Sequence, residues 1–231
     1  MKRAHLLTLC AVFLGLPLLP GAPVDAAPRT VADVVDRYRA PVEARLKPSF
    51  TARQIAFPPR KLTLIALKEE RLFELWAESA GQWKRVRSYP ILAASGRQGP
   101  KLLEGDLQVP EGVYRIALLN PNSSYHLSMK IDYPNAFDRQ QAKQDGRTRL
   151  GGEIFIHGKD VSIGCVALGD EAIEELFFLV AKTGRENTQV IFAPFDLRKR
   201  PPGQPPRAQR PWIAQLYHTI SAELKTYPTG P

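Results

Sequence analysis

The chain has 231 residues, which is long enough for one domain of ordinary size with extensions at its ends. Hydrophobic residues make up 44% and charged residues 24%, and this balance excludes a chain that is disordered throughout. The formal net charge is +9. Neither an internal repeat nor a phosphate-binding P-loop is visible, which excludes a solenoid and a P-loop nucleotide-binding protein.

The first 26 residues have the pattern of a secretory signal peptide. Lys2 and Arg3 give a basic start, residues 6–19 are mostly apolar, and residues 24–26 offer a cleavage site. The apolar stretch is short for a membrane span, which needs about 20 residues. We therefore expect cleavage after Ala26 and a periplasmic location, with an uncleaved signal anchor as the alternative.

Cleavage would leave Cys165 as the single cysteine, because Cys10 lies in the signal segment. No intramolecular disulfide is then possible. A single thiol in an oxidising compartment indicates either pairing with another molecule or a reactive role. The simpler alternative is a small buried side chain without chemistry.

The chain after the signal segment is expected to begin with a helix and a β-meander. Apolar residues recur at spacings of three, four and seven over 30–46, which predicts a helix that Pro48 closes. Apolar and alternating runs predict three strands, at residues 62–67, 72–78 and 83–92.

The middle of the chain alternates between expected loops and strands. Residues 95–112 contain four glycines and little periodicity, so we expect a long loop of the kind that carries function. The elements expected after it are strands at 113–119 and 125–131, a polar loop at 132–149, a strand at 154–156, a helix at 170–182 capped by Asp170, and a strand at 188–193. The pattern predicts a mostly β fold of the α+β class.

The composition changes toward the C-terminus. Residues 198–211 are basic and proline-rich, which indicates a solvated spacer or, alternatively, electrostatic docking on an anionic polymer or membrane. Trp212, Leu216, Ile220 and Leu224 mark a short amphipathic helix that we expect to pack back on the domain. The expected division of the chain is a signal peptide at 1–26, an N-terminal helix and connector at 27–60, a main domain at 61–197, and a linker with the C-terminal helix at 198–231.

Residues 154–168 carry the candidate chemistry. An apolar strand ends at His157, and Cys165 follows in a short loop that contains glycine. A histidine within hydrogen-bond reach of a thiol is what nucleophilic thiol catalysis requires. Gly158 and Gly164 permit positive φ angles and close backbone approach, so that N–H groups can point at a developing oxyanion.

Three segments of the chain resemble a known family. Residues 99–114, 120–138 and 156–165 resemble, in the same order, the L,D-transpeptidase catalytic domain (YkuD-like) of bacterial cell-wall enzymes. The most similar branch has the motif HG…SxGC and includes an enzyme that detaches the major outer-membrane lipoprotein from peptidoglycan. The resemblance implies that 61–197 is a catalytic domain of the YkuD-like β-sandwich or barrel type with a few flanking helices.

The resemblance also implies roles for individual residues. Cys165 would be the nucleophile and His157 the general base and then the acid, while Ser162 would help to position them. Backbone N–H groups of Gly164 and Cys165 would hold the oxyanion. The substrate would be a peptidoglycan stem peptide, including one linked to lipoprotein, cut or joined at the carbonyl of meso-diaminopimelate. No metal, cofactor or nucleic acid is implied.

Two positions depart from the family pattern. Most members have His and Arg where this chain has Ile163 and Ala167. The missing Arg leaves the substrate carboxylate to other residues, and the candidates are Lys101, Arg139 and Arg149. Tyr125 and His126 are further candidates for substrate binding, and His126 is also the alternative to His157 as base.

Three functions are compatible with these observations. A hydrolase would pass the acyl group to water and release an attached peptide or lipoprotein. A true L,D-transpeptidase would pass it to an amine, which forms a cross-link or anchors a protein. An inactive module would bind peptidoglycan without chemistry, although Cys165 and His157 in one segment argue against it. We expect the hydrolase.

Overall fold

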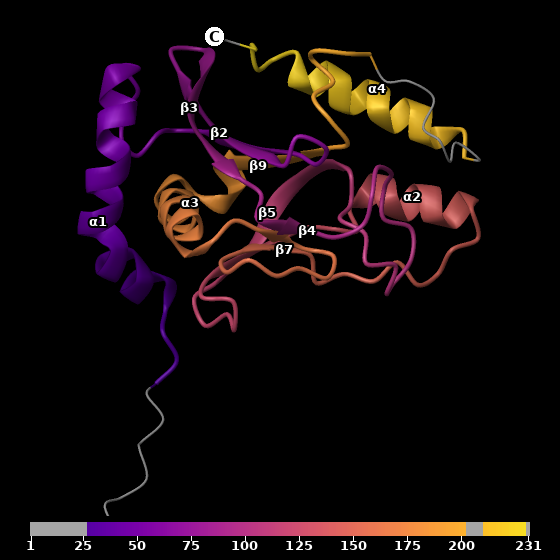
Figure 1. Cartoon of the computed structure of the whole chain (residues 1–231), viewed down its shortest axis with the longest axis horizontal. Helices are drawn as coiled ribbons and strands as arrows, with labels where there is room; N and C mark the ends of the chain where they lie inside the picture. Colours follow the sequence, from indigo (N-terminus) through magenta and orange to yellow (C-terminus); the bar gives the residue numbers. More distant parts are fainter. Residues whose placement is uncertain (1–26, 202–209, 230–231) are drawn as a thin grey trace, which may run out of the picture.

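The computed structural model describes residues 27–201 and 210–229 (Figure 1). The predicted signal peptide and most of the predicted linker lie outside these residues. The strands are β1 Leu62–Leu67, β2 Leu72–Ser79, β3 Gln82–Pro90, β4 Ala93–Ala94, β5 Gly112–Asn120, β6 Ser128–Ile131, β7 Phe155–His157, β8 Val166–Ala167 and β9 Thr188–Ala193. The helices are α1 Val31–Ala52, α2 Ala136–Gln144, α3 Asp170–Thr183 and α4 Trp212–Leu224, with a 3-10 turn at Arg185–Asn187.

The strands form one mixed sheet in the order β3-β2-β1-β9-β5-β6-β7-β8-β4. The antiparallel β1-β2-β3 meander expected from the sequence is confirmed. The late strand β9 lies at the centre of the sheet, where it pairs in parallel with β1 and antiparallel with β5. The α+β class expected from the sequence is therefore confirmed.

Both faces of the sheet are covered, and each face has its own apolar cluster. Leu64 and Phe73 point to the side covered by α1 and α3. Ile65 and Trp76, which have the opposite parity on the same two strands, belong to a second cluster under α4, on the opposite side of the sheet (Figure 1). Strands buried on both faces explain why β1 and β2 carry large apolar residues at both parities. None of the helices in the described residues is long and apolar enough to cross a membrane.

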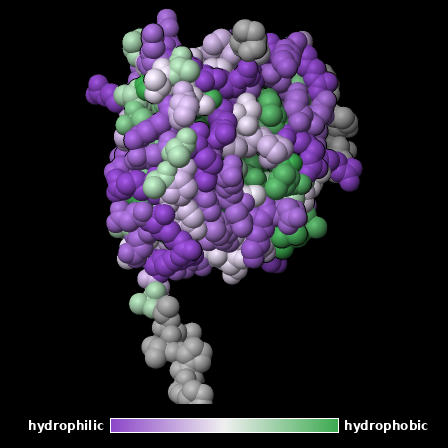
Figure 2. Space-filling model, turned by 60° about the vertical axis from the view of Figure 1, so that its left-hand side comes forward, coloured by the Kyte–Doolittle hydropathy of each residue, from purple (hydrophilic) through white to green (hydrophobic). Residues whose placement is uncertain are grey.

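Helix α1 starts as expected and ends later than expected. A capping box joins Thr30 and Asp33 at its start. The expectation that Pro48 ends the helix is wrong, because Pro48 lies inside it. The apolar stripe continues four residues beyond Leu46 to the buried ring of Phe50, and this burial offsets part of the roughly 3 kcal/mol that an internal proline costs. Figure 2, in which the α1 side of the molecule comes forward, shows a mostly hydrophilic outer face.

Helix α2 lies where the sequence predicted a polar loop, so that expectation is wrong. Asn135 and Asp138 form a capping box, in which each side chain accepts a hydrogen bond from the backbone N–H of the other. Only Gln141 and Ala142 of the helix are buried. The helix therefore lacks the apolar stripe by which α1 was recognised.

Two further expectations about local structure are corrected. His126 was expected inside a strand, but β6 begins at Ser128, and His126 has a left-handed φ of 73° in the preceding loop. Asp170 was expected to cap α3, but the N-cap is Gly169, and no side chain caps that end. Asp170 instead accepts a hydrogen bond from the backbone N–H of Lys159, so it ties α3 to the loop that follows β7.

Candidate active site

The short strands β7 and β8 bring Cys165 beside the strand that ends at His157. Ile156 and Val166 lie opposite each other in this parallel pair, and both side chains are fully buried in the core. Side chains alternate along a strand, so His157, one residue after Ile156, points away from this buried pair. Cys165 comes directly before β8 and contacts the backbone of β7. The N–H of Phe155 donates a hydrogen bond to Sγ of Cys165 at 3.4 Å, which fixes the thiol beside β7.

The hydrogen bonds of His157 leave it a free basic nitrogen. Its Nδ1 lies 2.7 Å from the carbonyl oxygen of Gly158. A carbonyl oxygen can only accept, so Nδ1 carries the proton and Nε2 has the lone pair. The ring of Tyr125 covers the imidazole, with centroids 4.6 Å apart, and His157 is 2% exposed. Burial lowers the pKa of His157 below its ordinary value of 6.5, which keeps the imidazole neutral and able to accept a proton.

The surroundings of Cys165 favour the protonated thiol. Burial raises its pKa, and the charge of Glu153 raises it further. The hydrogen bond from Phe155 and the charge of Lys101 lower the pKa but do not reverse the direction. Within the described chain no hydrogen bond joins His157 to Cys165, and Sγ instead lies 3.7 Å from the carbonyl oxygen of Glu153. The resting pair is therefore a thiol and a neutral imidazole, and not an ion pair.

The pH dependence of alkylation tests this assignment. We expect the rate of iodoacetamide labelling at Cys165 to rise with a midpoint above about 8.5, the value for a free thiol. His157→Ala should leave this midpoint unchanged, because a neutral imidazole does not stabilise the thiolate by charge. A midpoint below 8.5 that His157→Ala raises would show that the resting state is an ion pair after all.

Ser162 holds the backbone of Cys165 from both sides. Its hydroxyl donates to the carbonyl oxygen of Cys165 at 2.6 Å and accepts from the N–H of Cys165 at 3.0 Å. The N–H of Gly164 donates to the hydroxyl of Ser95. Both N–H groups expected to form the oxyanion hole are thus already bonded. They can stabilise an oxyanion only if the hydroxyls share them or turn away.

The two glycines of the motif are required for different reasons. Gly164 has a φ of +108°, a region that side chains rarely adopt. Gly158 has no such angle. A Cβ there would come within 2.6 Å of Oδ1 of Asp170 and 2.8 Å of the carbonyl oxygen of Tyr125. Gly158 therefore lets α3 and the loop before β6 approach the end of β7.

The four residues predicted to bind substrate lie in different surroundings. Lys101 is buried, with Nζ 2.6 Å from Asp106, and its charge acts on Cys165. Tyr125 covers His157 and is 40% exposed. The structure thus brings Lys101 and Tyr125 to the site.

Arg149 and His126 are directed elsewhere. The Arg149 side chain is 81% exposed and pairs with Glu104. Nε2 of His126 lies 2.9 Å from Glu174 on α3, and its ring contacts Tyr38 on α1. These contacts place the His126 imidazole between two helices. Arg139, the third cation considered, lies exposed on α2.

The sequence did not identify the residues that hold the long loop at 95–111. Nζ of Lys68, just after β1, donates to the carbonyl oxygens of Gly99 and Val109 and lies 2.8 Å from the buried carboxylate of Glu111. Tyr217 of α4 donates to the same carboxylate at 2.7 Å. The loop in turn presents Ser95 to the N–H of Gly164. No sequence signal pointed to Lys68, because it lies 27 positions before the loop and meets it only in the fold.

The described residues contain no group of three or more His, Cys, Asp or Glu side chains placed to hold a metal ion.

Comparison with known proteins identifies a related family. A model of the family YkuD, the L,D-transpeptidase catalytic domain, matches residues 61–192. YafK of Escherichia coli (strain K12), named provisionally as an L,D-transpeptidase, is 37% identical over 133 residues, which are 55% of this chain and 52% of YafK. YafK of Escherichia coli O157:H7 gives the same values. The chain thus spans about half the length of the curated relatives it matches.

Similar solved structures overlap with this chain in part. The helical cell shape determining protein Pgp2 from Campylobacter jejuni has a TM-score of 0.49 and 24% identity, over 58% of this chain and 48% of Pgp2. L,D-transpeptidase 1 of Mycobacterium tuberculosis has a TM-score of 0.34 and 12% identity, over 57% of this chain and 61% of that protein.

Proposed function

The chain belongs to the L,D-transpeptidase catalytic domain family, and from this membership we propose that it is a periplasmic cysteine enzyme acting on peptidoglycan stem peptides. It cleaves the amide at the diaminopimelate carbonyl and so releases an attached peptide or outer-membrane lipoprotein. The proposal places the mature N-terminus at Ala27. The observation that carries it is that Sγ of Cys165 lies beside β7, the strand that ends at His157, and that Nε2 of His157 is unprotonated.

The first half-reaction forms a thioester. Sγ of Cys165 bonds to the diaminopimelate carbonyl carbon as the thiol proton passes to Nε2 of His157. The C–N bond then breaks, and the proton moves from His157 to the departing amine. Apo hydrogen bonds of this kind commonly tighten only when substrate binds, so the separation of the two groups in the free enzyme is no obstacle.

The second half-reaction releases the product. Water gives a proton to Nε2 of His157 and attacks the thioester carbon, and the proton then returns to the departing sulfur of Cys165. Products are a free carboxyl group and the original thiol. The ammonium of Lys101 lowers the pKa of Cys165 and thereby favours the thiolate as it leaves. Ser162 keeps the backbone of the nucleophile fixed throughout.

Transpeptidation is the second candidate, and the provisional name of YafK favours it. Both functions share the thioester, and they differ in whether water or an amine resolves it. Cys165 is half-buried, so its thiol is not sealed inside the core.

Digestion of purified sacculi separates these functions. Sacculi with and without linked lipoprotein are incubated with the enzyme, and released muropeptides are identified by mass. We expect shortened stem peptides and free lipoprotein without new diaminopimelate–diaminopimelate cross-links, and no change with Cys165→Ala. New cross-links would make transpeptidation the function. An unchanged muropeptide profile with the native enzyme would favour a binding module without chemistry.

A further inference from the structure

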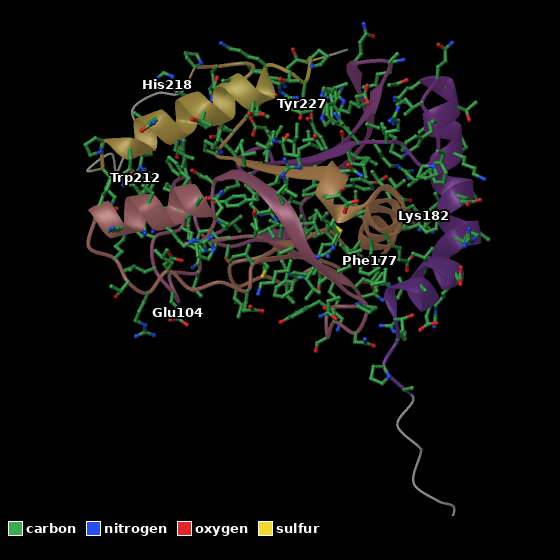
Figure 3. All side chains as sticks on the ribbon, turned by 180° about the vertical axis from the view of Figure 1, so that it is seen from behind. Glu104, Phe177, Lys182, Trp212, His218 and Tyr227 are labelled. Carbon is green, nitrogen blue, oxygen red and sulfur yellow. The ribbon has the colours of Figure 1, made fainter. Side chains whose placement is uncertain are left out.

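A groove between α2 and α4 has the features of a second binding site. Its volume is about 340 Å³, within the range of small-molecule sites. Trp212 lies at the end of α4 that approaches α2 (Figure 3), where its indole N–H donates to Asp145 at 3.1 Å. Asp145 also binds Arg147 and Arg210, so this end of the groove is rigidly held. The lining residues are Phe137, Gln140, Gln141, Gln144, Pro211, Trp212 and Gln215.

The lining carries no charge and combines amides with aromatic rings. Four of the seven lining residues are glutamines, and each amide can both donate and accept. The rings of Phe137 and Trp212 meet edge to face, with centroids 6.0 Å apart. A pyranose sugar has the complementary chemistry, because its C–H face packs on an aromatic ring while its hydroxyl and acetamido groups pair with amides. An anion or a cation would find no counter-charge among the lining side chains.

Gln141 is a second observation that points to a ligand in this groove. It is 4% exposed, and its Oε1 is the one buried side-chain nitrogen or oxygen in the described residues that lacks a hydrogen-bond partner. Such atoms are rare, because leaving one unpaired costs about 1–3 kcal/mol. The terminal amide torsion of glutamine is broad, so a small rotation can turn this oxygen toward a donor in the groove.

We infer that the groove binds a neutral N-acetylated sugar unit of a glycan chain. The inference rests on the proposed function, since the stem peptides of peptidoglycan are attached to such a chain. A glycan held between α2 and α4 keeps its attached peptides close to the enzyme and so raises their effective concentration at Cys165.

The test measures binding of N,N′,N″-triacetylchitotriose, a neutral sugar without peptide, by calorimetry. Gln141→Leu should weaken binding about three- to tenfold, the effect of one lost hydrogen bond. It should also leave the thermal midpoint unchanged or higher, because it removes an unpartnered polar atom. Gln215→Ala, at an exposed position, should weaken binding similarly. Gln82→Ala, at an exposed glutamine that begins β3, is the matched control and should bind as the native protein does.

Two outcomes overturn the inference, and both can be told apart from failure of the proposed function. Absence of binding by the native protein, or equal binding by Gln141→Leu, Gln215→Ala and Gln82→Ala, rules out a sugar site in this groove. Cys165→Ala should bind the trisaccharide normally. An enzyme that cleaves stem peptides without binding the sugar contradicts only the groove, whereas sugar binding without cleavage contradicts only the proposed function.

Discussion

His157→Ala is expected to slow formation of the acyl-enzyme by about 100- to 10,000-fold, the usual contribution of a general base. The thiol of Cys165 is protonated at neutral pH because burial raises its pKa, so attack depends on a group that removes the proton. Nε2 of His157, at the end of the strand beside which the thiol lies, is the unprotonated nitrogen. Single-turnover acylation by a diaminopimelate-containing stem peptide measures the effect.

His126→Ala is the matched control for this change. The ring of His126 is bound to Glu174 and packs on Tyr38, so its loss should alter stability more than the acylation rate of the folded variant. The acylation rate of the native enzyme should fall as the pH is lowered, with a midpoint below 6.5, because burial lowers the pKa of His157. Abolished acylation in His126→Ala with a nearly intact rate in His157→Ala would reverse the two roles.

Glu175→Gln is expected to lower the free energy of unfolding by about 3 kcal/mol, as when one partner of a buried ion pair is removed. The carboxylate is fully buried, and it accepts from Arg45 at 2.7 Å, Arg87 at 2.9 Å and Tyr89 at 2.8 Å. It therefore joins α1, β3 and α3. The side chains of Arg45 and Arg87 are 24% and 35% exposed, so water can partly solvate their charges when the carboxylate is removed. The expected loss of about 3 kcal/mol therefore lies at the low end of the usual range for buried ion pairs.

Urea unfolding of Glu175→Gln and Glu171→Gln gives the comparison. The Glu171 side chain is 70% exposed and lies 3.9 Å from Arg45, so its substitution should change the free energy by less than about 0.5 kcal/mol. Equal effects of the two substitutions would show that burial of Glu175 does not govern the strength of the cluster.

The strands of the meander could be predicted because their patterns are local. The turn at Ala80 and Gly81 and the flanking apolar runs suffice to define β2 and β3. The central position of β9 could not be predicted, since its parallel pairing with β1 joins residues 126 positions apart, such as Leu62 and Thr188. Strands β4 and β8 have two residues each, too few to show a period.

The part of the candidate site that lies in one short segment could be predicted, and the part that comes from distant segments could not. His157, Ser162 and Cys165 lie within nine positions, so their sequence pattern is visible without a fold. The contacts that determine their chemistry come from distant segments, as with Ser95 on the N–H of Gly164 and Tyr125 on His157. The direction of the Cys165 pKa shift depends on burial, which no local pattern reveals.

The central claim is that Cys165 carries the acyl group of the stem peptide as a thioester. Intact-protein mass spectrometry after rapid acid quench of the enzyme with a diaminopimelate-containing stem peptide tests it most directly. We predict a mass increase equal to the acyl fragment, located on the tryptic peptide that contains Cys165, and no such adduct with Cys165→Ala. An adduct on another residue, or cleavage of the stem peptide by Cys165→Ala at the native rate, would contradict the claim.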